Sequence, residues 1–111
     1  ARYKKLTGRY LEIWGELGEM YAEFRHGLVR HPRHHPGSDG TIGGALVEVK
    51  TISPGKKSAR VHIKRNSNFE KLLIIKVSED FWFSSKLFDR AALKEGASPL
   101  IKARWDSDGG P

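Results

Sequence analysis

An apolar run at residues 45–52 constrains this chain more than any other stretch. It reads Ala-Leu-Val-Glu-Val-Lys-Thr-Ile and is followed by Ser-Pro-Gly, so it predicts one β-strand with a defined end. Because side chains alternate between the two faces of a strand, Glu48 and Lys50 are expected to point the same way. Two charged groups are costly to bury in such a run. This face of the strand therefore needs an explanation, and a surface ion pair between Glu48 and Lys50 is the simplest one.

The first part of the chain predicts a long helix. Thr7 can cap its start and Gly27 can end it. Large apolar residues recur between these limits at three- and four-residue spacing: Tyr10, Trp14, Leu17, Tyr21 and Phe24. Four acidic residues form a second stripe on the same helix: Glu12, Glu16, Glu19 and Glu23. A solvated acidic face explains most of this second stripe.

The remaining elements are expected to be short. We expect strands at residues 28–30, 60–64, 71–77, 81–88 and 98–105, and a short helix at residues 90–95. A helix followed by several strands and a little more helix predicts an α+β fold with one mixed sheet. The length of 111 residues suits a single domain over residues 1–111, with a frayed tail at 106–111.

A candidate metal site follows from one further acidic residue. Asp39 lies nine positions before Glu48, in the turn-rich stretch 36–40, which can bring its carboxylate back beside Glu48. Mg²⁺ is usually held by one or two carboxylates together with water and phosphate. An adjacent Lys50 can orient the attacking water or stabilise charge on a phosphate. This set of groups predicts metal-assisted hydrolysis of phosphodiester bonds with Mg²⁺ or Mn²⁺.

The same residues resemble a known signature. Asp39, eight intervening residues and then Glu48-Val49-Lys50 are similar to the motif of the PD-(D/E)xK nuclease superfamily. The resemblance covers residues 9–90 and implies a reduced restriction-endonuclease-like core that hydrolyses DNA. In that superfamily a helix before the motif hairpin often supplies another acidic residue. Glu19 resembles that residue, with Glu16 as the second choice. The implied catalytic set is Asp39, Glu48, Lys50 and Glu19, with the three carboxylates as metal ligands.

The sequence departs from the family pattern in two respects. Ser38 precedes Asp39 where the signature has Pro, and the nearest Pro is Pro36. No long helix is expected between the later strands, where the family core normally has one. These departures imply a reduced core, or a core that a second copy completes.

Charge points to a polyanionic partner. The chain has 20 Lys and Arg against 13 Asp and Glu, a formal charge of +7. Nucleic acid, DNA in particular, is the expected partner, and plain solubility is the alternative reading. Six basic residues are expected to contact phosphates as a positive rim beside the metal: Arg33, Lys56, Lys57, Arg60, Lys64 and Arg65. A solvated hairpin would show the same pattern.

Two other clusters have both functional and structural readings. His26, His31, His34 and His35 lie within ten residues of one another, which allows a zinc site or a basic loop that contacts phosphates together with Arg30. Residues 81–83, Phe-Trp-Phe, can stack on unpaired bases, or can serve as core on one face and dimer contact on the other.

Location and assembly are predicted from what the sequence lacks. It has no apolar run of about 18 residues that would span a membrane and no signal-peptide pattern, so we expect a cytoplasmic protein without a membrane partner. So short a chain has little surface with which to grip a duplex, and a homodimer or a larger assembly is expected. Two rival functions remain open: an inactive nucleic-acid-binding module of the same fold, and a protein-interaction domain of toxin or immunity type.

Overall fold

The computed structural model describes residues 2–32, 38–56, 58–93 and 96–105, with side chains in the first helix described from Ile13 onward. Together these residues form one long helix, seven strands and one turn of 3₁₀ helix. In chain order the elements are α1 (Arg2–His26), β1 (Val29–Arg30), β2 (Gly40–Ile42), β3 (Ala45–Ile52), β4 (Arg60–Lys64), β5 (Lys71–Val77), β6 (Phe83–Asp89), η1 (Arg90–Ala92) and β7 (Leu100–Arg104).

Helix α1 ends where the sequence predicts and begins earlier. Gly27 has a φ of 71°, a left-handed conformation that glycine adopts without steric cost. Its N–H donates to the carbonyl of Glu23, and the next N–H, of Leu28, donates to the carbonyl of Ala22. These two bonds close the last turn of the helix. The predicted start is wrong, because the helix already begins at Arg2 and Thr7 lies inside it.

The strands form two sheets. The larger has the order β1-β2-β3-β5-β6, in which β3 and β5 are parallel and the other neighbours are antiparallel. The smaller sheet is the antiparallel pair β4 and β7, here called the β4–β7 ribbon. The α+β class is therefore confirmed. The expected mixed sheet is confirmed too, but it does not hold all the strands, because β4 alternates apolar and polar residues and buries one face only, whereas residues 72–75 of β5 are all buried.

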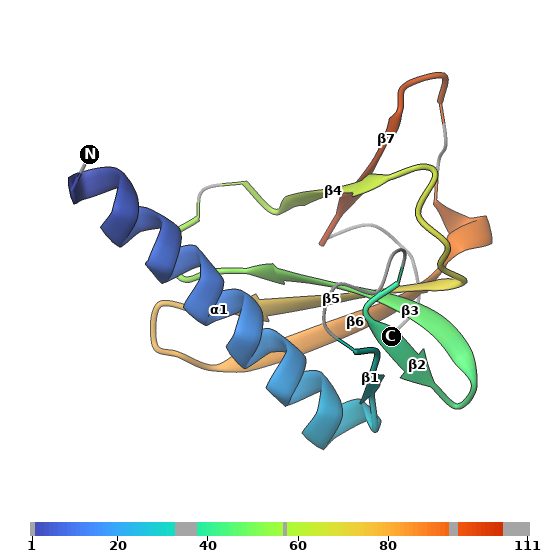
Figure 1. Cartoon of the computed structure of the whole chain (residues 1–111), viewed down its shortest axis with the longest axis horizontal. Coiled ribbons are helices and arrows are strands. Elements are labelled where there is room, and N and C mark those ends of the chain that lie inside the picture. Colours follow the sequence, from blue (N-terminus) through green and yellow to red (C-terminus); the bar gives the residue numbers. More distant parts are fainter. Residues whose placement is uncertain (1, 33–37, 57, 94–95, 106–111) are drawn as a thin grey trace.

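The elements pack as three layers, with the larger sheet in the middle (Figure 1). On one face, here called the helix face, Val47, Val49 and Leu73 pack with Ala22 of α1. On the opposite face, the ribbon face, the sheet packs against the inward side chains of the β4–β7 ribbon. The ribbon-face core comprises Ile52, Val61, Ile63, Phe69, Leu72, Ile74, Phe88, Ile101 and Ala103.

Two local expectations differ from the structure. The strand expected from residue 81 begins at Phe83, because Phe81 has a φ of 63° within the turn from Ser78 to Trp82. The predicted helix at 90–95 is a 3₁₀ turn over Arg90–Ala92, and residues 94 and 95 lie outside the described residues. Phe24, at the end of the predicted apolar stripe of the helix, is 89% exposed.

Candidate active site

Asp39 sits where strand β2 separates from β3. Its N–H donates to the carbonyl of Val47, and the β2–β3 pairing does not extend past Val47. Two residues further along β3, on the edge that faces β2, the N–H of Val49 has no partner in β2. It donates instead to Oδ2 of Asp39, at 2.7 Å. The expected return of Asp39 to the motif strand is thus present in the structure.

The residues just before and after Asp39 hold it in this place. Ser38 is buried, and its carbonyl and hydroxyl lie 3.1 and 3.4 Å from Nδ1 of His31. The N–H of His31 also donates to the carbonyl of Asp39. A Cβ atom at Gly40 would overlap the carbonyl oxygen of Val29, so β1 approaches here as closely as glycine permits. The position that departs from the family signature, Ser38, therefore has a packing and hydrogen-bonding role.

Glu48 projects from β3 onto the ribbon face, with its side chain 12% exposed. Its Oε2 lies 3.7 Å from Nζ of Lys50, and its Oε1 accepts a hydrogen bond from Ser67 at 3.4 Å. Burial raises the pKa of Glu48 to about 7, and the charge of Asp39 and a hydrogen bond between the two carboxyl groups add to this rise. Lys50 and Ser67 oppose it. A distance of 3.7 Å is long for an ion pair, and Lys50 does not offset the cost of burial and of the second carboxylate.

Glu19 approaches Asp39 from the helix face. Burial is the main reason that the pKa of Glu19 is raised, and the charge of Asp39 is the second. Arg30 acts in the opposite direction. Asp39 therefore lies between Glu19 and Glu48, which belong to opposite faces of the sheet. Within the described residues, no three His, Asp or Glu side chains group closely enough to hold a metal ion by themselves.

The second choice for the helix carboxylate, Glu16, is engaged elsewhere. Arg30 donates to Glu16 at 2.8 Å and pairs with Glu23 at 2.9 Å. The expectation that Arg30 contacts phosphates does not fit this arrangement, because its guanidinium bridges two carboxylates of α1. Its side chain is only 26% exposed.

Two residues that the sequence did not single out support Glu48. Ser67 is the hydrogen-bond donor to Glu48. Arg90 holds the segment that carries Ser67, because its guanidinium donates to the carbonyls of Arg65 (2.6 Å), Ser67 (2.8 Å) and Phe69 (3.4 Å). It also lies over the Phe69 ring, 4.3 Å from the ring centroid. Nothing in the local sequence marks either residue, since they are 19 and 42 positions from Glu48.

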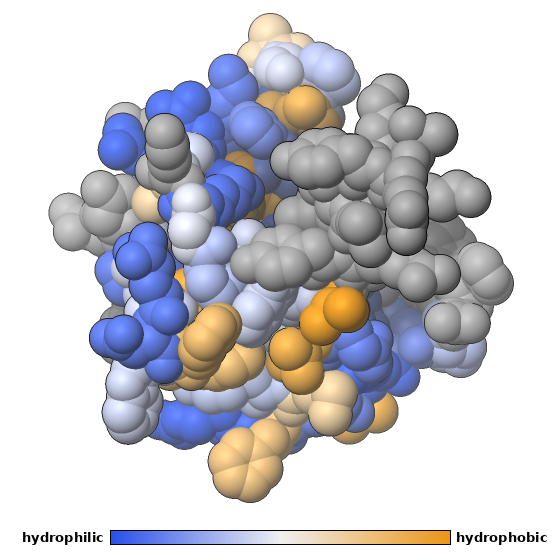
Figure 2. Space-filling view, turned by 90° about the vertical axis from the view of Figure 1, so that its left-hand side faces the viewer, coloured by the Kyte–Doolittle hydropathy of each residue, from blue (hydrophilic) through white to orange (hydrophobic). Residues whose placement is uncertain are grey.

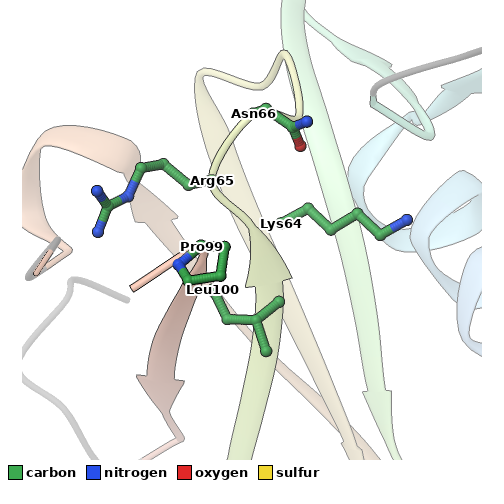
Figure 3. A pocket seen from close by; sticks show the side chains of 5 residues that line it. All are labelled: Lys64, Arg65, Asn66, Pro99 and Leu100. Atoms are coloured by element: carbon green, nitrogen blue, oxygen red, sulfur yellow. The ribbon is translucent and has the colours of Figure 1, made fainter. Parts of the chain in front are cut away.

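Four of the six basic residues predicted to form a positive rim lie in the described part of the chain. Lys56, Arg60 and Lys64 are exposed, and Arg65 is half-buried, with two guanidinium nitrogens that are buried and unpartnered among the described residues. Lys64, Arg65 and Asn66 line an open hollow together with Pro99 and Leu100, and Figure 3 shows the Lys64 and Arg65 side chains extending in opposite directions. Arg33 and Lys57 lie outside the described residues.

The structure also describes part of the histidine cluster and of the aromatic segment 81–83. Nε2 of His26 lies 2.7 Å from Oγ of Ser85, while Nδ1 of His31 faces Ser38, so these two rings serve separate sites. His34 and His35, the other candidate zinc ligands, lie outside the described residues. Phe81 stacks on Trp14 with ring centroids 5.8 Å apart, and Phe83 stacks on Tyr21 at 5.3 Å.

Comparison with protein-family models gives no match for this sequence, and comparison with curated protein sequences gives none either. In the part of the chain that the structure describes, no helix is both long and apolar enough to cross a membrane.

Proposed function

We propose that the chain is a metal-dependent nuclease of PD-(D/E)xK type that hydrolyses DNA phosphodiester bonds. The observation that carries the proposal is the position of Asp39, whose Oδ2 accepts from the N–H of Val49 between Glu48 and Lys50, next to the 12% exposed side chain of Glu48. Two carboxylates so placed disfavour two negative charges unless a cation is present. Burial raises the pKa of Glu48 most, and the charge of Asp39 adds to the rise.

The donor set fits Mg²⁺ or Mn²⁺. Asp39 uses Oδ2 for the Val49 N–H, which leaves Oδ1 for a metal, and Glu48 offers a second carboxylate beside it, which accepts from Ser67 and lies 3.7 Å from Nζ of Lys50. Two protein carboxylates suffice for Mg²⁺, which keeps several waters and binds phosphate oxygens. When bound, the ion would polarise the phosphate and lower the pKa of a bound water.

The protein groups then have separate roles. Asp39 and Glu48 hold the metal, and Lys50, 37% exposed, is placed to orient the attacking water or to stabilise charge on the phosphate. Glu19 supports the metal shell through its proximity to Asp39. The order of elements adds support, since α1 precedes the hairpin that carries Asp39 and Glu48.

Cleavage of supercoiled plasmid tests the proposal. The purified chain is incubated with Mg²⁺, Mn²⁺ or EDTA, beside the variants Lys50→Ala and Lys71→Ala. Lys71 is a matched control, because it is 36% exposed and pairs with a carboxylate, that of Asp89, on the same sheet. Nicking that requires metal, is lost in Lys50→Ala and persists in Lys71→Ala supports a nuclease. Absence of nicking with either metal refutes it.

The rival functions give different results in a binding assay. An inactive nucleic-acid-binding module would bind DNA in a salt-sensitive manner and show no metal binding. A protein-interaction domain of toxin or immunity type would show no DNA affinity at low salt. The proposed nuclease binds both DNA and metal.

We further propose that the nuclease acts as a homodimer, with a second copy docking along α1. Ile13, Met20 and Phe24 are 56, 50 and 89% exposed. Spacings of seven and four residues place them on one line of the helix. Figure 2 shows apolar groups (orange) that reach the surface on one side of the molecule as small islands among hydrophilic ones. Sedimentation velocity tests this, with dimers expected for the unmodified chain and monomers for Phe24→Glu. Monomers of the unmodified chain at all concentrations would refute it.

A further inference from the structure

The outer face of the β4–β7 ribbon is strongly basic. Val61 and Ile63 of β4 point into the core, as do Ile101 and Ala103 of β7. The alternate positions of both strands are exposed. Apart from Leu100, these outward residues are all basic or imidazole side chains: Arg60, His62, Lys64, Lys102 and Arg104.

The strand register brings these groups directly opposite one another. Arg60 pairs with Arg104, and His62 pairs with Lys102. Side chains at opposite positions of an antiparallel pair have Cβ atoms about 5 Å apart, so the outward groups of the two strands form one continuous surface. Neither β4 nor β7 contains an Asp or Glu, and the charged groups of this face are therefore all positive. A polyanion complements such a concentration of positive charge.

The dimensions of the ribbon fit duplex DNA better than duplex RNA. Two antiparallel strands lie about 5 Å apart, and their exposed side chains recur about every 7 Å along each strand. The major groove of B-DNA is about 12 Å wide and admits a two-stranded ribbon. The major groove of duplex RNA is too narrow and deep for side chains to read. We infer that the outer face of the β4–β7 ribbon is a docking surface for duplex DNA and enters the major groove.

This surface adjoins the candidate active site without being part of it. Lys64 ends β4 only three residues before Ser67, which donates to Glu48. Three residues span at most about 11 Å. DNA that follows the ribbon past Lys64 would therefore pass the segment that carries Ser67. The inference rests on the proposed function for this alignment, whereas binding at the ribbon requires no hydrolysis.

The experiment measures fluorescence anisotropy of a duplex of about 20 base pairs, of the matching single strand and of the same duplex as RNA. All titrations contain EDTA, so that cleavage does not interfere, and run from roughly 50 to 200 mM salt. The test variant is Lys64→Ala with Lys102→Ala. The control is Arg25→Ala with Lys71→Ala, which removes the same two positive charges from exposed or half-exposed positions away from the ribbon. Thermal unfolding followed by circular dichroism establishes that both variants are folded.

The ribbon variant is expected to bind duplex DNA on the order of tenfold more weakly and to lower the salt slope by about two. The control variant should stay within about twofold of the unmodified chain at the same salt. Equal losses in both variants would overturn the inference, since net charge alone would then explain binding. Equal affinity for single strands or duplex RNA would also overturn it, as would no DNA binding at low salt.

Failure of the nuclease proposal remains distinguishable from failure of this inference. Lys50→Ala reports on cleavage, and the ribbon variant reports on duplex affinity. Ribbon-dependent binding without any plasmid cleavage would refute the nuclease and support the docking surface. Plasmid cleavage that is insensitive to the ribbon variant, with unchanged duplex affinity, would support the nuclease and overturn the docking surface.

Discussion

The Oδ2 atom of Asp39 lies 2.7 Å from the backbone nitrogen of Val49, the residue between Glu48 and Lys50. One hydrogen bond thus fixes a carboxylate from the β2 side of the hairpin against the middle of the motif strand. It also satisfies a backbone N–H at the point where strand pairing stops, a group that would be costly to leave without a partner. Folding of the hairpin and assembly of the carboxylate pair therefore depend on the same contact.

Asp39→Asn should separate these two roles. Asparagine keeps an acceptor for the Val49 N–H and removes the negative charge. Mn²⁺ affinity should fall at least about tenfold, which corresponds to about 1.4 kcal/mol. The pKa of Glu48 should fall as well, because the charge of Asp39 raises it. Isothermal titration calorimetry measures the first effect and carboxyl NMR titration the second. Asp89→Asn, at a 70% exposed carboxylate elsewhere on the sheet, is the control; equal Mn²⁺ affinity in both variants would contradict the prediction.

Glu48 should make stability depend on pH. Its pKa is about 7 in the folded chain against an ordinary 4.5, so the folded state retains a proton that the unfolded state loses. The unfolding free energy should therefore fall between pH 4.5 and 7, by roughly 3 kcal/mol for a shift of this size. Its contribution is complete below pH 4.5 and is lost as pH rises through 7.

Glu48→Gln removes this titration and should be the more stable chain at pH 8, with little difference at pH 4.5. Urea unfolding at both pH values measures this. Mg²⁺ should stabilise the unmodified chain at pH 8 and leave the variant unchanged, because binding to the folded state alone raises stability. A pH-independent difference between the two chains would show that Glu48 ionises normally.

Two glycines of α1 should respond to alanine in opposite ways. A Cβ at Gly18 would overlap Oγ1 of Thr51, which faces the helix one residue after Lys50, whereas a Cβ at Gly15 has nothing within 4 Å. Gly18→Ala should lower the unfolding free energy by roughly 1–3 kcal/mol through overpacking. Gly15→Ala should raise it by up to about 1 kcal/mol through helix propensity.

Thermal unfolding of the two variants compares them directly. Combining Gly18→Ala with Thr51→Ala should recover part of the loss, because the overlapping hydroxyl is removed. Stabilisation by both single substitutions would mean that α1 does not pack against β3 at this point.

Arg90→Lys should weaken the site from a distance. Arg90 donates to three carbonyls of the segment 65–69, and a lysine ammonium cannot reproduce that planar fork. The loss of bonds from a charged donor should cost about 1.5–3 kcal/mol in unfolding free energy. Plasmid cleavage, assayed well below the midpoint of unfolding, should also fall, since Ser67 loses its support beside Glu48. Full activity in a destabilised variant would limit Arg90 to a structural role.

The local spacing of apolar and polar residues was sufficient to predict much of the secondary structure. The spacing of apolar residues predicted α1, and Gly27 predicted its end, because a left-handed residue after a helix is a local requirement. The run 45–52 predicted β3, whose bounds Ala45–Ile52 match it. Alternation along that strand placed Glu48 and Lys50 on one face, and their 3.7 Å contact agrees with this.

Contacts between distant segments could not be derived in the same way. The pairing of β4 with β7 joins residues about 40 positions apart, and the place beside β3 is filled by β5, whose residues 72–75 are all buried. Ser67 and Arg90 support Glu48 through such contacts, and Glu16 is excluded from the site by Arg30.

The sequence by itself therefore determined which residues carry charge and on which side of a strand or helix they lie, because 2- and 3.6-residue periods are properties of the backbone. Only the tertiary structure decided which of those faces meet. Asp39 reaches Val49 and Glu48, Glu19 stays on the opposite face of the sheet from Glu48, and two basic strands combine into one ribbon. These outcomes depend on burial and packing across the whole chain, and no local pattern encodes them.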